Sequence, residues 1–175
     1  TFPSTDEGVA WMVTAEGKTV FHAGDLNWWH WEEESEYYKN RLQKNGIDFT
    51  IFLKDDFSIS INRGKIVQII DNLISNSEYW LIKLKGNDPK CKPSITIKIE
   101  SPWIYFYDNG YGISPAIENM LFEPFVTTKP KGEGRGLGLF IIQQLLDSSK
   151  CTIALEPFRN EHGRKYIFAI NFSNI

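Results

Sequence analysis

A glycine-rich segment, GEGRGLGLF at residues 132–140, runs directly into an apolar stretch with helical spacing. Glycine lets backbone N–H groups converge on a ligand, and the start of a helix adds a partial positive charge. Together these features favour the binding of an anion such as phosphate. We therefore predict that Gly134, Gly136 and Gly138 cradle phosphate groups. A flexible surface loop is the alternative that composition alone leaves open.

Three polar side chains elsewhere have chemistry that complements a phosphate cradle. Asn72 and Asn76 are four residues apart in a stretch with helical spacing, so their amides share one helix face. Asp108 ends a strand-like run, and Gly110 and Gly112 after it let the backbone approach a flat ligand closely. The carboxylate of Asp108 could accept a hydrogen bond from an exocyclic amine. A solvated helix face and an ordinary turn are the respective alternatives.

Two long helices and a set of strands are predicted to position these groups. Apolar residues recur at helical spacing through residues 64–85 and again through 136–149, and a solvated helix is expected at 32–46. Alternating or β-branched runs predict a hairpin at 9–23 with its turn at Glu16-Gly17, and strands at 47–56, 57–62, 94–100, 103–108, 151–156 and 165–172. This order predicts an α+β fold, a two-layer α/β sandwich in which helices cover one face of one mixed or antiparallel sheet.

The order and spacing of these motifs resemble the Bergerat-fold (GHKL) ATP-binding superfamily of type II topoisomerases, heat-shock chaperones, mismatch-repair ATPases and histidine kinases. DNLISNSEYW resembles its N box, DNGYGI its first glycine box, FEPFVTTK its F box and GRGLGL its second glycine box, over about residues 41–173. The last two are most similar to the catalytic domain of sensor histidine kinases. The resemblance implies the Bergerat fold, with ATP and Mg²⁺ as ligands.

The resemblance also assigns roles to individual positions. It implies that Asp108 accepts the amino hydrogen bond of adenine, that Asn76 is a ligand of Mg²⁺, and that Asn72 lies near the phosphates. Trp80 is implied to pack on the base, which is physically reasonable for an indole, and core packing is the alternative. The other positions implied to contact the nucleotide are Gly110, Gly112, Phe125, Thr128, Gly134, Gly136, Leu137 and Gly138.

One position departs from the histidine-kinase pattern. Tyr79 stands where many kinases have a Lys that contacts phosphate. We expect Lys129, Lys131 or Arg135 to compensate. Lys129 and Arg135, together with Asn72, are therefore the candidates for groups that act on the phosphates during transfer.

Position 72 separates hydrolysis from phosphotransfer within the superfamily. Hydrolysing members carry a water-activating Glu where this sequence has Asn72, and an amide cannot take up a proton. Asp71 is no easy substitute, because a neighbouring helical residue points about 100° away. Loss of a general base costs about 10² to 10⁴ in rate. We therefore predict a histidine-kinase-like phosphotransferase that is a poor ATPase.

The phosphoacceptor is expected outside this chain. His22, His30 and His162 do not lie in a helical acceptor motif, and His162 is predicted to sit in a turn between the last two strands. The expected partners are a histidine-bearing acceptor domain or protein and, downstream, a response regulator. A nucleotide-binding interaction module or slow ATPase without kinase activity is the alternative function.

Composition limits the partners and the cellular location that we expect for the protein. A net charge of −3 and a pI near 5.6 give no general attraction to nucleic acid or to an anionic membrane. Cys91 and Cys151 are far apart and lack metal-site spacing, so neither a disulfide framework nor a zinc site is indicated. No apolar stretch approaches the roughly 20 residues that a membrane span needs. We expect a cytoplasmic location, with no direct membrane contact by this segment.

The first residues of the chain do not fit the kinase pattern. GKTVFHAGDLNWWHW, within residues 1–35, resembles a fragment of the metallo-β-lactamase-fold hydrolases, in which the position of Asp25 bridges metals. The family's histidine-rich cluster is missing, so a first metal site cannot assemble. A metal-dependent hydrolase is thus the weaker hypothesis. We expect residues 1–40 to be an N-terminal extension or a fused fragment, and residues 41–175 to be a histidine-kinase-like ATP-binding domain.

Overall fold

A mixed five-stranded sheet is built from strands that lie within residues 48–171. The structure, a computed structural model, describes residues 9–15, 18–23, 29–55, 57 and 59–174. The strand order is β3-β5-β6-β8-β7, with β3 parallel to β5 and the other neighbours antiparallel. The strands are β3 (Asp48–Leu53), β5 (Ser94–Glu100), β6 (Trp103–Asp108), β7 (Thr152–Leu155) and β8 (Ile167–Asn171). The mixed sheet confirms the predicted fold class.

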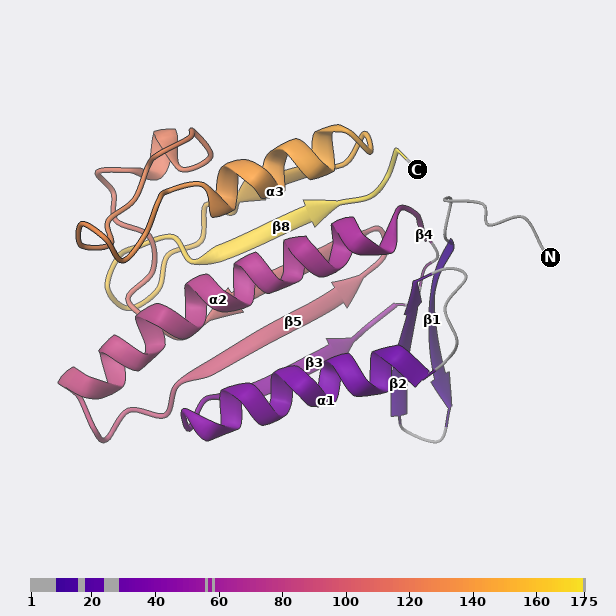
Figure 1. Cartoon of the computed structure of the whole chain (residues 1–175), viewed down its shortest axis with the longest axis horizontal. Helices are drawn as coiled ribbons and strands as arrows, with labels where there is room; N and C mark the ends of the chain where they lie inside the picture. Colours follow the sequence, from indigo (N-terminus) through magenta and orange to yellow (C-terminus); the bar gives the residue numbers. More distant parts are fainter. Residues whose placement is uncertain (1–8, 16–17, 24–28, 56, 58, 175) are drawn as a thin grey trace.

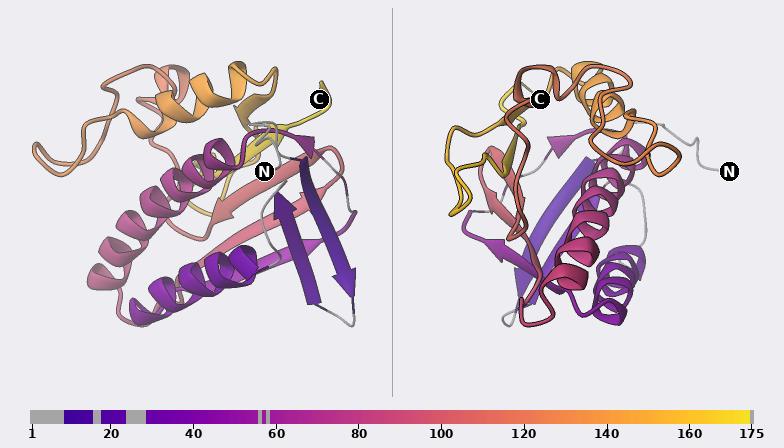
Figure 2. Two further views of the ribbon diagram at one scale, coloured as in Figure 1. Left: turned by 45° about the vertical axis from the view of Figure 1, so that its right-hand side comes forward. Right: turned by 90° about the vertical axis from the view of Figure 1, so that its left-hand side faces the viewer.

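Helices cover one face of this sheet, as the sequence predicts (Figures 1 and 2). They are α1 (Trp29–Lys44), α2 (Arg63–Asn87) and α3 (Gly138–Asp147). Asn62 caps α2, because its side-chain oxygen accepts the N–H of Gly64 at 2.8 Å. The helix ends at Asn87, just before Asp88-Pro89, because proline disfavours a helical conformation in the residue that precedes it.

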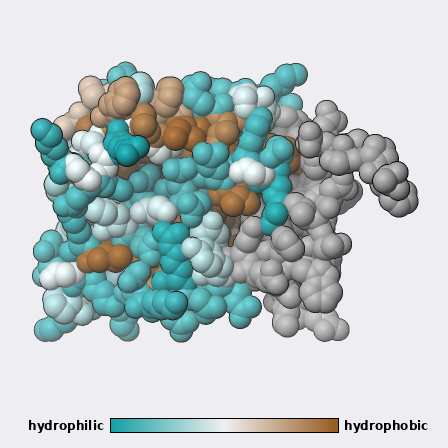
Figure 3. Space-filling view, viewed as in Figure 1, coloured by the Kyte–Doolittle hydropathy of each residue, from teal (hydrophilic) through white to brown (hydrophobic). Residues whose placement is uncertain are grey.

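The core lies between the helices and the sheet. The apolar stripe of α2 contributes Ile66, Ile70, Leu73 and Leu81, all buried, as its helical spacing predicts. The sheet contributes alternate residues to the core, because every second residue of β5 is buried. On the face drawn in Figure 3, hydrophilic residues dominate, and apolar ones gather near α3.

Helix α1 is less solvated than predicted, because two of its residues join the core. Tyr38 and Leu42 are buried, while Arg41 on the same helix reaches the back of α2. The Arg41 guanidinium pairs with Asp71 at 3.2 Å and with buried Glu78. Removing one partner of such a part-buried pair leaves the other uncompensated. The network therefore fixes α1 against the helix that carries both asparagines.

A second, small sheet stands beside the first turns of α1 (Figure 1) and corrects the prediction of one sheet. The predicted hairpin forms from β1 (Val9–Ala15) and β2 (Lys18–Ala23), whereas Glu16-Gly17 lies outside the described residues. The strand predicted at 57–62 shortens to β4 (Ile59–Ser60), which pairs with the edge of β1 instead of the main sheet. Helix α1 runs through residue 40, and the two-part division remains a prediction.

Candidate functional site

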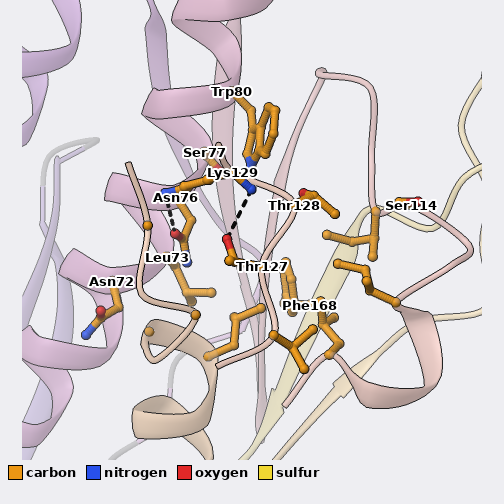
Figure 4. A pocket seen from close by; sticks show the side chains of 18 of the residues that line it. Asn72, Leu73, Asn76, Ser77, Trp80, Ser114, Thr127, Thr128, Lys129 and Phe168 are labelled. Atoms are coloured by element: carbon orange, nitrogen blue, oxygen red, sulfur yellow. Dashed lines mark hydrogen bonds between the residues drawn. The ribbon is translucent and has the colours of Figure 1, made fainter. Parts of the chain in front are cut away.

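A cavity of about 640 Å³ opens between α2 and the loops before α3. This size is typical of a small-molecule site. Figure 4 shows α2 side chains on one side of it and Thr128, Ser114 and Phe168 on the other. Its lining comprises Asn72, Leu73, Asn76, Ser77, Trp80, Asp108, Tyr111, Gly112, Ile113, Ser114, Ile117, Leu121, Val126, Thr127, Thr128, Lys129, Gly134, Arg135, Gly136, Leu137, Gly138, Leu139, Ile141, Arg164 and Phe168.

One end of the cavity is built around Asp108, the last residue of β6. Its carboxylate accepts a hydrogen bond from the Ser77 hydroxyl on α2 and another from the N–H of Gly110 at 2.9 Å. The side chain keeps some exposure through the cavity but is otherwise surrounded by protein. Burial raises the pKa of Asp108, against the opposing effect of its two hydrogen bonds. The result is a fixed acceptor that faces a partly desolvated space.

Glycines beside Asp108 allow a close approach of backbone segments. A methyl group at Gly110 would lie 2.9 Å from the Asp108 carboxylate. Gly112 has φ +76°, and a methyl group there would lie 2.9 Å from the carbonyl oxygen of Lys165 and 3.0 Å from Cβ of Arg164. The loop between β7 and β8 is thereby clamped onto the first glycine box. A side chain at Gly112 would force that loop away from the cavity.

Another part of the cavity lining, where α2 meets the start of α3, carries the two asparagines and a lysine. Lys129 Nζ donates to Asn76 Oδ1 at 3.1 Å (Figure 4), and Asn72 Nδ2 donates to the Gln68 carbonyl at 2.7 Å. A methyl group at Gly138, where α3 begins, would lie 3.2 Å from Asn72 Oδ1 and 3.4 Å from Asn76 Nδ2. Partial burial lowers the pKa of Lys129. Two amides, an ammonium group and a helix start therefore meet at one place.

The glycine-rich segment folds tightly against the F box. Gly136 has φ +65°, and a methyl group there would lie 2.4 Å from the carbonyl carbon of Phe125. The N–H of Phe125 donates to the Gly136 carbonyl at 2.8 Å, and Phe125 itself has φ 68°. Gly134 packs similarly, since a methyl group would lie 2.8 Å from the Lys129 side chain. The segment is an ordered turn packed against residues 125–129 rather than a loose loop.

The structure brings together residues that lie far apart in the sequence. Asn72, Asn76, Trp80, Asp108, Gly112, Thr128, Lys129, Gly134, Arg135, Gly136, Leu137 and Gly138, all predicted site residues, line the same cavity. Gly110 supports Asp108 from outside the lining. Phe125 contributes its backbone to the turn, but its ring is 74% exposed and does not line the cavity. Direct contacts with a nucleotide remain predictions for all of them.

Two neighbouring aromatic residues on α2 play different parts. Trp80 is half-buried and lines the cavity. This position argues against the alternative that Trp80 only packs in the core. The Tyr79 ring lies edge-on to it, with ring centroids 5.0 Å apart at 89°. The Tyr79 hydroxyl points to Glu133, not to the cavity. The position that departs from the kinase pattern is thus occupied by a group that contacts the glycine-rich segment.

Sequence reasoning missed several residues of the site. Ser77 lies buried among the apolar residues of α2, and a serine at such a position is the signal in the sequence that it bonds a buried group. Thr127, Tyr111 and Arg164 also line the cavity, and Thr127 Oγ1 accepts the N–H of Lys129 at 3.1 Å. Arg164 comes from the last loop, which only the tertiary fold brings to this place.

The remaining candidate groups lie away from the cavity. His162 sits in the loop between β7 and β8, where its side chain is 41% exposed and its ring is 5.3 Å from that of Tyr111. Asp25 and the side chains of His22 and His30 lie outside the described part of the chain. Among the described residues, no group of His, Cys, Asp and Glu is arranged to hold a metal. Those same residues contain no helix that is long and apolar enough to cross a membrane.

Solved structures of histidine kinases have the same fold. The catalytic domain of the histidine kinase ThkA matches with a TM-score of 0.62 at 24% identity, over 81% of this chain and 89% of that one. The mycobacterial sensor histidine kinase MprB matches with a TM-score of 0.62 at 16% identity, over 79% of this chain and 88% of that one. The predicted Bergerat fold is therefore confirmed.

Curated relatives include bacterial sensor proteins. The sensor protein ChvG of Rhizobium meliloti is 31% identical over 126 residues, which are 67% of this chain and 21% of the relative. The two-component sensor PprA of Pseudomonas aeruginosa is 34% identical over 85 residues, which are 47% of this chain and 9% of the relative. The chain thus spans about a fifth or less of these two relatives. The family described as histidine kinase-, DNA gyrase B-, and HSP90-like ATPase matches residues 61–174, and this chain belongs to it.

Proposed function

We propose that this chain binds Mg-ATP and is the catalytic domain of a histidine-kinase-like phosphotransferase. One observation carries the proposal: Asn72, Asn76, Asp108 and the glycine-rich segment meet around a single cavity. Family membership supports ATP as the ligand. The acceptor histidine comes from another domain or protein, and a response regulator is the expected downstream partner. Such ATP-dependent signalling belongs in the cytoplasm.

The two ends of the cavity suit the two ends of ATP. The Asp108 carboxylate is an acceptor for the amino group of adenine, and Trp80 offers an indole face to the base. Lys129, Arg135 and the start of α3 provide positive charge for the phosphates. The groups assigned to the phosphates thus come mainly from residues 129–138, and those assigned to the base come from β6 and α2.

The residues at the phosphate end also fit Mg²⁺. Mg²⁺ prefers oxygen ligands and commonly binds through few protein groups together with phosphate oxygens and water. Asn76 Oδ1 already accepts a hydrogen bond from a cation, the Lys129 ammonium, so this oxygen is directed to a place where positive charge fits. Asn76 would hold the ion, which would neutralise charge on the phosphates. Lys129 is then free to contact a phosphate oxygen.

The charge pattern favours phosphotransfer over hydrolysis. Asn72 cannot act as a general base, and its neighbour Asp71 pairs with Arg41 on the far side of α2. Neither Asp71 nor Glu78 lines the cavity. A histidine acceptor brings its own nucleophilic nitrogen, so the site needs only to position the phosphoryl group and stabilise its charge. These features support a kinase over an efficient ATPase.

Transfer of labelled phosphate tests this proposal. The chain is incubated with γ-labelled ATP, Mg²⁺ and a candidate histidine acceptor domain, and acid-labile label on the acceptor is measured. We expect transfer by the wild type and by Asn119→Ala, an exposed asparagine outside the cavity, and none by Asn76→Ala. Binding of ATP without transfer to any acceptor would instead favour a nucleotide-binding interaction module.

A further inference from the structure

Residues 130–133, here called the lid segment, are tied to helix α2. Glu133 accepts hydrogen bonds from the Tyr79 hydroxyl and from Lys83 Nζ, the latter at 3.0 Å, and both bonds end on the same carboxylate oxygen. Tyr79 and Lys83 are four residues apart on α2, so they project from one face of the helix. The lid segment is therefore held at its last residue by two groups from one helix.

A second contact holds the residue that precedes the lid segment. Lys129 Nζ lies 4.3 Å from the centre of the Tyr79 ring while it donates to Asn76 Oδ1. Lys83 Nζ lies 4.7 Å from the same ring. Attraction between an ammonium group and an aromatic face operates at this range. Tyr79 thus contacts the chain on both sides of the lid segment, through its ring and through its hydroxyl.

The tie lies directly next to the predicted phosphate cradle. Glu133 precedes Gly134, which packs against the side chain of Lys129. Tyr79 and Lys83 lower the pKa of Glu133, so the carboxylate is charged at neutral pH. Both lysines and the carboxylate are at least partly open to solvent, so the contacts can break without unfolding the core. This arrangement can hold the lid segment down and still release it.

We propose that Tyr79, Lys83 and Glu133 form a clasp that holds the lid segment on α2 and slows the passage of nucleotide into and out of the cavity. Glu133 is a positioning residue, because it acts through the lid segment without lining the cavity. The inference gives a role to Tyr79, the position where the sequence departs from the kinase pattern. Its kinetic part rests on the proposed nucleotide binding, whereas the clasp itself does not.

Amide hydrogen exchange tests the clasp in the nucleotide-free protein. Amides of residues 131–136 are expected to exchange faster in Glu133→Gln and in Tyr79→Phe than in the wild type. Glu123→Gln is the matched control, since Glu123 is an exposed carboxylate on the preceding loop. Unchanged exchange in Glu133→Gln, with the protein folded, would overturn the clasp whether or not the chain binds nucleotide.

Stopped-flow fluorescence with an N-methylanthraniloyl derivative of ADP and Mg²⁺ tests the kinetic role. Exposed charged contacts are weak, so the release rate constant is expected to rise about threefold to tenfold in Glu133→Gln. Tyr79→Phe should raise it less, and the double variant should release no faster than Glu133→Gln alone. A wild-type release rate in Glu133→Gln, or fully additive effects, would overturn the proposal. A wild type that binds no nucleotide would instead refute the proposed function.

Discussion

The end of the cavity at Asp108 is held by short, buried contacts, whereas the end at Lys129 is held by long side chains near solvent. Ser77 and the Gly110 backbone fix the Asp108 carboxylate, and Gly112 admits the last loop at close range. Lys129, in contrast, reaches Asn76 from a loop and can adopt another direction. The surroundings of Asp108 are thus fixed by buried contacts, whereas the Lys129 side chain is freer to move; these are the parts of the cavity that we propose bind the base and the phosphates.

Asp108→Asn should produce the largest effect, because it breaks the preformed end. A hydrogen bond to a charged group contributes about 1.5 to 3 kcal/mol, so affinity for ATP and for adenosine should fall roughly tenfold to hundredfold. Isothermal titration calorimetry with both ligands measures the loss. Affinity for ATP within about twofold of wild type in a folded variant, where a tenfold change is 1.4 kcal/mol, would remove Asp108 as the reader of adenine.

The same variant has an expected stability signature. Burial raises the pKa of Asp108 in the folded protein, so ionisation of this carboxyl group destabilises the fold. The protonated carboxyl therefore stabilises the fold relative to the ionised one. This stabilisation is complete below the pKa that Asp108 has in the unfolded chain, and it is lost as the pH rises through its higher pKa in the folded protein. Asparagine does not ionise, so the variant does not lose this stabilisation. The melting temperature of Asp108→Asn minus that of the wild type should therefore increase as the pH rises from acidic to neutral. A difference in melting temperature that does not change with pH would contradict this assignment.

Lys129→Met should separate the two ends of the cavity. The ammonium group is predicted to contact phosphates only, so affinity for ATP should fall about tenfold while that for adenosine stays within about twofold. Fluorescence or calorimetric titrations with both ligands give the comparison. Lys90→Met, an exposed lysine in the turn after α2, is the control. Equal losses for both ligands would mean that the two ends are not independent.

Asn72→Glu should have the smallest effect and tests the chemistry of the phosphate end alone. A carboxylate introduced here supplies a general base that the surrounding residues do not position, so the slow release of phosphate from ATP should rise by about tenfold, less than the roughly 10² to 10⁴ that a well-positioned base contributes. Asn119→Glu adds the same charge outside the cavity as a control. Steady-state phosphate release that stays unchanged or falls, with ATP still bound, would contradict the role given to position 72.

Local patterns predicted the main elements well. The stripe of α2, the hairpin of β5 and β6 and the start of α3 follow from periodicity and glycine placement, which are local properties. The short strand β4 was misassigned to the main sheet, because its partner β1 lies about fifty residues earlier and pairing over that distance leaves no local trace. Likewise Tyr38 and Leu42 are buried only because α1 packs on the sheet.

Site residues that belong to sequence motifs were predictable. Contacts between side chains that only the tertiary fold brings together were less so. The sequence motifs indicate Asn76 and Lys129 separately, but their contact depends on how the lid segment folds back onto α2. The Ser77 bond to Asp108 and the position of Arg164 depend on pairings between elements that no single stretch of sequence encodes. The spacing of residues in the sequence identifies the site residues, and tertiary packing determines which of them are in contact.

Calorimetric titration of the wild type with ATP, in the presence and absence of Mg²⁺, tests the central claim most directly. The account predicts binding at a single site that is strengthened by Mg²⁺ and is clearly weakened in the Asp108→Asn and Asn76→Ala variants while both remain folded. Absence of Mg²⁺-dependent binding of ATP or ADP by the folded wild type up to about 1 mM, which corresponds to about −4.1 kcal/mol, would contradict it.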